Sequence, residues 1–142
     1  MRIREFTMDD YDSVRQLWQA CRLPIGFEEA REQLGLKLER DPGLFLVAEE
    51  NDAILGTVMG AWDGRRGWVY DQAVEPRCRR TGIGRRLMEE LHRRLEAKGA
   101  RCISLIVDRD NITAQDFFGA YGFTVEEGQL LMQRQLTGEG CP

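Results

Sequence analysis

Residues that bind zinc are scarce in this sequence. His92 is the only histidine, and the four cysteines, Cys21, Cys78, Cys102 and Cys141, are widely spaced and form no Cys-x-x-Cys pair. Structural zinc sites draw about four such ligands from short, regular spacings. The sequence therefore predicts no metal site, and we interpret the cysteines as isolated reduced thiols.

Long apolar runs are also absent. No stretch approaches the roughly 20 residues that a membrane-spanning helix needs. The first residues, Met-Arg-Ile-Arg-Glu, lack the apolar centre of a signal peptide. Hydrophobic residues make up 42% and charged residues 31% of the chain, a balance typical of soluble globular proteins. We predict a cytoplasmic protein that binds no membrane.

The chain has no excess of positive charge. Its net charge is −4, which argues against nucleic acid as a partner. Against this acidic background the arginines between Arg77 and Arg86 form a local concentration of positive charge. The contrast favours a small anionic ligand over a polyanion.

The length of 142 residues suits one domain, spanning residues 1–142, and we find no internal repeat or linker. Apolar periodicity and turn residues predict the elements, and a capping box of Thr7 and Asp10 begins the first helix. The predicted order is a strand at 2–6, a helix from 7 to about 21, a helix at 28–40, strands at 44–49, 53–62 and 68–74, a helix at 82–98, a strand at 102–107, a helix at 111–120, and closing strands at 123–126 and 130–136.

The segments 68–74, 82–98 and 102–107 predict a right-handed crossover between two parallel strands. The other strands are expected to pair antiparallel. The predicted fold class is therefore α/β, or α+β, with one mixed and mostly antiparallel sheet, a single parallel β-α-β crossover and helices on both faces.

A loop rich in arginine and glycine joins the first two segments of this crossover. Gly82 and Gly84 are spaced one residue apart, directly before an amphipathic helix. The N-terminus of a helix offers N–H groups without partners and a partial positive charge, which suit phosphate oxygens. Glycine has no Cβ, so a ligand can approach the main chain closely. The loop is therefore predicted to bind a diphosphate at the end of a central strand.

Two motifs in this order of elements resemble the GNAT family of acetyl-CoA-dependent N-acetyltransferases. The first is Arg79-x-x-Gly82-x-Gly84, preceded by Val74-x-Pro76. The second is Asn111-x-x-Ala114 followed by Gly122-Phe123. The resemblance covers essentially the whole chain, and the combination of both motifs in their strand and helix context is specific. The segment 56–67 also looks like the small YpeA-type branch of the family.

The resemblance implies acetyl-CoA as co-substrate and assigns residues to it. The main chain of Gln72, Ala73 and Val74 would pair with the pantetheine arm like an added strand. One N–H of this strand would polarise the thioester carbonyl. Asn111 and Phe118 would lie at the coenzyme near the last helix, although Asn111 alone is also a good N-cap. Around the pyrophosphate the implied residues are Arg79, Arg80, Thr81, Gly82, Ile83, Gly84 and Arg85, of which Arg79 is alternatively a salt-bridging surface residue.

The sequence departs from the family where catalysis is concerned. The usual general acid, a tyrosine, falls on Phe118, and two positions that often hold a carboxylate base fall on Trp68 and Ile106. The polar residues left on the central strand are Tyr70 and Asp71. Strand alternation places them on opposite faces. We hypothesise that one of them takes the proton from the incoming ammonium group; the alternative is a buried tyrosine and a structural aspartate.

Two classes of function follow. The first is direct acetyl transfer from acetyl-CoA to a primary amine of a small molecule, peptide or protein, in a ternary complex. The second is a non-catalytic acyl-CoA-binding module, which Phe118 favours. Residues 22–42 and 123–131 are expected to shape the acceptor pocket. Its acidic residues, Glu28, Glu29 and Glu32, suit either a cationic amine or an ordinary first helical turn. The sequence leaves a homodimer open, with Trp62 and Trp68 assigned to pocket, core or dimer contact.

Overall fold

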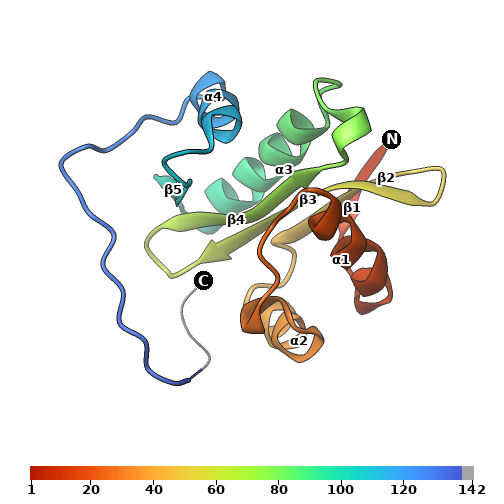
Figure 1. The fold of residues 1–142 in the computed structure, drawn as a ribbon, viewed down its shortest axis with the longest axis horizontal. Helices are drawn as coiled ribbons and strands as arrows, with labels where there is room; N and C mark the ends of the chain where they lie inside the picture. Colours follow the sequence, from red (N-terminus) through yellow and green to blue (C-terminus); the bar gives the residue numbers. More distant parts are fainter. Residues whose placement is uncertain (139–142) are drawn as a thin grey trace. The chain divides into compact units, whose positions relative to one another are not determined.

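The computed structural model describes residues 1–138 (Figure 1), so Cys141 and the end of the C-terminal tail lie outside the described residues. The chain divides into two compact units. The first is Met1–Leu105, and the second begins at Ile106. Each unit is described by itself, and the extent of the predicted domain, residues 1–142, stays a prediction.

The first unit is built on a five-stranded sheet whose strands follow the order of the chain. Neighbours pair antiparallel from β1 to β4, whereas β4 and β5 pair parallel. The predicted mixed sheet with one parallel pair is therefore confirmed. The turn between β2 and β3 places Asn51 and Asp52 at positive φ, which these residue types tolerate well. The strands are β1 (Arg2–Glu5), β2 (Phe45–Glu50), β3 (Ala53–Trp62), β4 (Gly67–Val74) and β5 (Ile103–Leu105).

Helices α1 (Tyr11–Ala20) and α2 (Arg31–Arg40) cover one face of this sheet (Figure 1). The short helix η1 (Met8–Asp10) precedes α1. The predicted capping box is confirmed there, because the Thr7 N–H donates to the Asp10 carboxylate at 2.9 Å. The predicted start of the second helix, at about residue 28, is wrong: Phe27–Glu29 form a separate helical turn, η2, and α2 begins at Arg31. The Glu29 carboxylate accepts the Gly26 N–H at 2.8 Å and caps that turn.

The core under α1 and α2 is aromatic at its centre. The Phe6 and Phe45 rings stack with centroids 4.1 Å apart, and the Trp18 ring lies parallel to Phe45 at 6.0 Å. Leu34 and Met59 complete this cluster from α2 and β3. Burial of this much apolar surface is the main favourable term in folding, and it joins both helices to the middle of the sheet.

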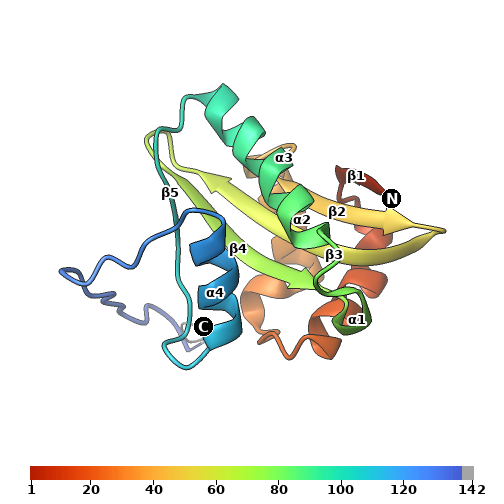
Figure 2. The same ribbon diagram turned by 90° about the horizontal axis from the view of Figure 1, so that it is seen from above.

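Helix α3 (Ile83–Lys98) covers the opposite face, as Figure 2 shows, and the predicted crossover from β4 to β5 is confirmed. Three glycines of the sheet let it approach closely. A Cβ on Gly60 would lie 2.5 Å from Leu91, and one on Gly67 would lie 2.9 Å from Leu95. These glycines place α3 tightly against β3 and β4, so the first turn of the helix is held at the end of β4.

Substituting the third glycine, Gly56→Ala, should destabilise the protein by about 1–3 kcal/mol through overpacking. The added Cβ would lie 2.9 Å from Ile83, 3.0 Å from Leu87 and 3.1 Å from the main-chain oxygen of Ala73. Equilibrium urea unfolding measures the change. Gly35→Ala in α2 is the control, because nothing lies within 4 Å of its Cβ; it should stabilise by up to about 1 kcal/mol. Equal stability of Gly56→Ala and wild type would contradict this packing.

The second unit contains helix α4 (Ile112–Ala120), which lies within the predicted helix. The predicted closing strands at 123–126 and 130–136 are wrong for the described residues, which contain no strand after β5. A strand exists through hydrogen bonds to a neighbouring strand, and a local apolar pattern cannot supply that neighbour. Leu130 and Met132 are accordingly 88% and 87% exposed. None of the described helices is long and apolar enough to cross a bilayer.

Candidate functional site

Strand β4 carries a β-bulge in its second half. The ladder with β3 pairs Tyr70 with Met59 and Ala73 with Thr57, so Asp71 and Gln72 together oppose a single residue, Val58. Asp71 has a φ of 47°, in the left-handed region. Regular alternation stops at such a bulge, so the prediction that Asp71 lies opposite Tyr70 no longer follows from strand geometry.

A buried hydrogen-bonded chain reaches the bulge from α1. The Trp18 indole N–H donates to the Thr57 hydroxyl at 2.9 Å, and this hydroxyl donates to the main-chain oxygen of Asp71 at 2.9 Å. Thr57 and Trp18 are 0% and 1% exposed. Asp71 is therefore held from inside the core, while its carboxylate is only half-buried.

The outer edge of β4 is open beyond the bulge. β5 pairs with β4 only from Gly67 to Val69, and within residues 1–138 no strand pairs with this edge along residues 70–74. The Glu75 N–H donates to the Leu55 oxygen at 2.8 Å, on the β3 side. Successive peptide groups alternate, so Ala73 also turns toward β3 whereas Val74 turns to the open edge. This edge suits an extended ligand that adds to the sheet like a strand.

The loop after β4 leads into the exposed N-terminus of α3. Arg80 and Gly82 have φ of 64° and 89°, and Gly82 is the N-cap. The Arg86 N–H donates to the Gly82 oxygen at 3.0 Å as the first helical bond. The N–H groups of Ile83 and Gly84 precede this bond and have no acceptor within the helix. A Cβ on Gly82 would meet no atom within 4 Å, so the space beside this N-cap residue is open.

This geometry fits a diphosphate. Its elements are a helix N-terminus without a side-chain cap, a main chain that a ligand can approach closely, and arginines on both sides. The Arg79 guanidinium donates to the Val74 oxygen at 3.4 Å, and the Cys21 thiol donates to the same oxygen at 3.2 Å. The loop and the open edge of β4 are thus connected at Val74 and form one continuous surface.

The bulge lies in a negative electrostatic environment. Burial raises the pKa of the Asp71 carboxyl from 3.8 to about 7, with further contributions from the charges of Glu29 and Glu28. Burial likewise raises the pKa of the Tyr70 phenol, followed by the charges of Glu28 and Asp63. The charge of Glu28, a residue of η2, thus acts on both groups. A carboxyl group with a pKa near neutrality can accept and release a proton at physiological pH.

The remaining predicted residues belong to the second unit. Asn111 is the N-cap of α4, and its side-chain oxygen accepts the Ala114 N–H at 3.1 Å. Phe118 is buried and packs edge-to-face against Phe117 and Phe123, at centroid distances of 5.0 and 5.6 Å. Both observations agree with local structural roles, and the predicted coenzyme contacts of Asn111 and Phe118 stay predictions.

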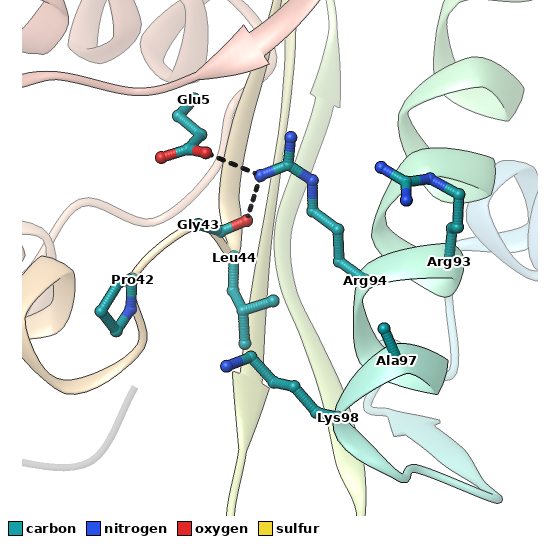
Figure 3. Close-up of a pocket in the computed structure, with 8 residues that line it drawn as sticks. All are labelled: Glu5, Pro42, Gly43, Leu44, Arg93, Arg94, Ala97 and Lys98. Carbon is teal, nitrogen blue, oxygen red and sulfur yellow. Dashed lines mark hydrogen bonds and ion pairs between the residues drawn. The ribbon is translucent and has the colours of Figure 1, made fainter.

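A separate hollow lies along the second half of α3 (Figure 3) and shares no residue with the loop or the bulge. At its centre the Arg94 guanidinium donates to the Glu5 carboxylate and to the Gly43 oxygen, both at 2.9 Å. These bonds tie α3 to the end of β1 and to the turn before β2. Among residues 1–138 no group of three or more acidic, histidine or cysteine side chains could hold a metal ion.

In the first unit the structure brings together residues that the sequence singled out separately. Tyr70 and Asp71 lie at the bulge, Gln72, Ala73 and Val74 follow it, and the loop from Arg79 to Arg85 adjoins them. Trp18 and Thr57 were missed as site residues. The available signal was a polar residue in the strand Gly56-Thr57-Val58, where the neighbouring pattern favours apolar residues.

Comparisons with known proteins agree with this geometry. Residues 7–123 match the model of the acetyltransferase (GNAT) family. The chain is 35% identical over 136 residues to an acetyltransferase of Sodalis glossinidius, covering 96% of each chain. It is 42% identical over 111 residues to an acetyltransferase of Pectobacterium atrosepticum, covering 78% of this chain and 79% of the relative.

Solved structures share the fold. The PaiA N-acetyltransferase of Thermoplasma acidophilum, crystallised with coenzyme A, superposes with a TM-score of 0.77 at 20% identity, over 88% of this chain and 90% of that protein. The family match, the sequence relatives and a loop at the open edge of β4 whose geometry fits a diphosphate lead to one conclusion. The chain belongs to the GNAT family of acetyltransferases and uses acetyl-CoA as its acetyl donor.

Proposed function

We propose that this acetyltransferase transfers the acetyl group directly to a primary amine, with acetyl-CoA and amine bound together, and that Asp71 takes up the ammonium proton. The observation that carries the proposal is the position of Asp71. Its carboxyl group belongs to a bulge next to the open edge of β4, and the charges of Glu29 and Glu28 act on it.

The coenzyme side of the proposal rests on main-chain groups. The N–H groups of Ile83 and Gly84 bind the pyrophosphate at the helix N-terminus. Val74 pairs with the pantetheine arm along the open edge and directs the thioester toward the bulge. Acetyl-CoA supplies an activated acyl group whose leaving thiol has an ordinary pKa of about 8.5, so it departs without a dedicated acid at Phe118.

The acceptor side rests on the negative charges around the bulge. The carboxylates of Glu28 and Glu29 favour the approach of a cationic ammonium group. Asp71 accepts one proton from it, directly or through a water molecule. The free amine then forms the new C–N bond as the C–S bond breaks, and the second proton lost from its nitrogen ends on the departing thiolate, giving the coenzyme A thiol. Tyr70, the residue before Asp71, is 46% exposed and provides a phenol that can orient the acceptor.

A coupled assay tests this function. Thiol release from acetyl-CoA is followed with the wild-type protein and a panel of amines comprising a small diamine, amino acids, a peptide with a free N-terminus and an aminoglycoside. We expect release to depend on at least one amine, with mass spectrometry finding one acetyl group on it. Acetyl-CoA without amine corrects for hydrolysis. Tight acetyl-CoA binding without release across the panel would instead favour a non-catalytic acyl-CoA-binding module.

Three finer expectations accompany this proposal. They are a cytoplasmic location, assignment to the YpeA-type branch and a homodimer, with Trp62 and Trp68 assigned to the acceptor pocket, the core or the dimer contact. Fractionation of cells that express the protein tests the first. Sedimentation of wild type and of the Trp62→Ala and Trp68→Ala variants tests the last.

A further inference from the structure

We propose that Thr57 is a positioning residue for acetyl transfer: its hydroxyl links Trp18 to the main chain of Asp71 and fixes the bulge that presents the Asp71 carboxylate. The inference rests on the proposed function, in which Asp71 accepts the proton. Thr57 cannot contact a substrate itself, because it is 0% exposed. Any effect it has on catalysis therefore passes through the main chain of Asp71.

The chemistry of the three groups sets the direction of both hydrogen bonds. An indole N–H can only donate, so the hydroxyl accepts from Trp18 at 2.9 Å. A main-chain oxygen can only accept, so the single hydroxyl proton points to Asp71, also at 2.9 Å. One hydroxyl thus satisfies a donor from α1 and an acceptor in β4.

The bulge creates the need for this hydroxyl. Because Asp71 and Gln72 share one opposing residue, the ladder with β3 is interrupted there. A side-chain hydroxyl of β3 then supplies the Asp71 oxygen with a donor. Aspartate tolerates the left-handed conformation found at Asp71, but tolerance does not select it over an extended one. The hydroxyl of Thr57 provides the selection, because it bonds the oxygen only where the bulge directs it.

Apart from the Trp18 indole and the Asp71 oxygen, the surroundings of Thr57 are apolar. Its neighbours across the sheet are Val47 on β2 and Ala73 on β4, both buried and apolar. Valine has the same shape as threonine without the hydroxyl, and it favours strands equally. Valine would therefore pack equally well against these neighbours, but it would leave both the Trp18 N–H and the Asp71 oxygen without this hydroxyl.

Thr57→Val tests the inference, with Thr57→Ser as the conservative variant that keeps the hydroxyl. We expect Thr57→Val to lower kcat/KM by about 10–100-fold through misplacement of Asp71, with kcat falling and the KM for acetyl-CoA little changed. Thr57→Ser should keep most of the activity. A carboxyl carbon-13 NMR titration should give Asp71 a pKa of about 7 in wild type and in Thr57→Ser. In Thr57→Val the pKa of Asp71 should be lower, because a misplaced carboxyl group is less buried. Glu28 and Glu29, whose charges also raise this pKa, are the same in all three proteins.

Val47→Ala is the matched control, since Val47 is the register partner of Thr57 in the same core. It should lose stability but keep the pH profile of kcat/KM. If Thr57→Val does not fold, Trp18→Phe removes the donor that orients the hydroxyl and should change the profile in the same direction. Unchanged kcat and an unchanged Asp71 titration in the folded variant would overturn the inference. If wild type acetylates no amine, the proposed function fails, and the titrations still decide whether Thr57 positions Asp71.

Discussion

Asp71→Asn should lower kcat/KM for the acetylated amine by about 10²–10⁴-fold, the usual contribution of a general acid or base. Asparagine keeps the size of the side chain and adopts the left-handed conformation of this position readily, so the bulge should persist. The variant can no longer accept the ammonium proton. Steady-state thiol release at saturating acetyl-CoA measures the loss. An unchanged kcat/KM would assign Asp71 a structural role only.

The pH profile of wild type should carry the signature of the same carboxyl group. Asp71 accepts a proton only when ionised, and its pKa is raised from 3.8 to about 7, so kcat/KM should rise as the pH increases through about 7. Glu28→Gln removes one of the negative charges that raise this pKa. In Glu28→Gln the rise of kcat/KM should therefore occur at lower pH. In Asp71→Asn the activity that remains should show no rise near pH 7.

Stability should vary with pH in the opposite sense. The folded state binds the Asp71 proton more tightly than the unfolded chain does, because its folded pKa of about 7 exceeds the ordinary 3.8. This contribution is fully present below about pH 4 and is lost as the pH rises through 7. Asp71→Asn should therefore be more stable than wild type at pH 8 and similar to it near pH 4. Urea unfolding at the two pH values checks the sign.

Gly82→Ala should weaken acetyl-CoA binding by about 10²-fold, or about 2.7 kcal/mol, as measured by calorimetry. Gly82 has a φ of 89°, which a residue with a Cβ adopts at a cost, so the turn should shift and the first N–H groups of α3 should lose their alignment. The added methyl group would meet no atom within 4 Å, so the expected loss comes from the main-chain conformation and not from a clash inside the protein.

Gly99→Ala separates loss of the site from loss of stability. Gly99 ends the same helix, has a φ of 108° and likewise has no atom within 4 Å of a Cβ. This control should show a similar loss of stability and unchanged affinity for acetyl-CoA. Equal affinity in both variants would mean that the N-terminus of α3 does not bind the coenzyme.

Local sequence features predicted the loop before α3 and the start of this helix, because their conformation is determined locally; the binding of a diphosphate there stays a prediction. Gly82 provides the positive φ, and the apolar spacing of Ile83, Leu87 and Leu91 defines both the start of α3 and its buried face. The crossover also followed from the lengths of the three segments. These elements depend little on distant parts of the chain, and the structure has them within one residue at most ends.

The bulge could not be predicted, because it depends on pairing between strands. No residue near Asp71 indicates a positive φ in the sequence. Aspartate tolerates this conformation, but its presence does not predict it. The bulge appears only when β3 is placed beside β4 and the Thr57 hydroxyl meets the Asp71 oxygen. The prediction of the closing strands was wrong for a related reason: an apolar pattern near Leu130 does not supply a partner strand.

The most direct measurement is an amide nitrogen-15 NMR titration with coenzyme A. We expect the largest shifts at the N–H groups of Ile83, Gly84 and Val74, with a smaller shift at Asp71. Shifts concentrated in the second half of α3, with these three amides unmoved, would contradict it.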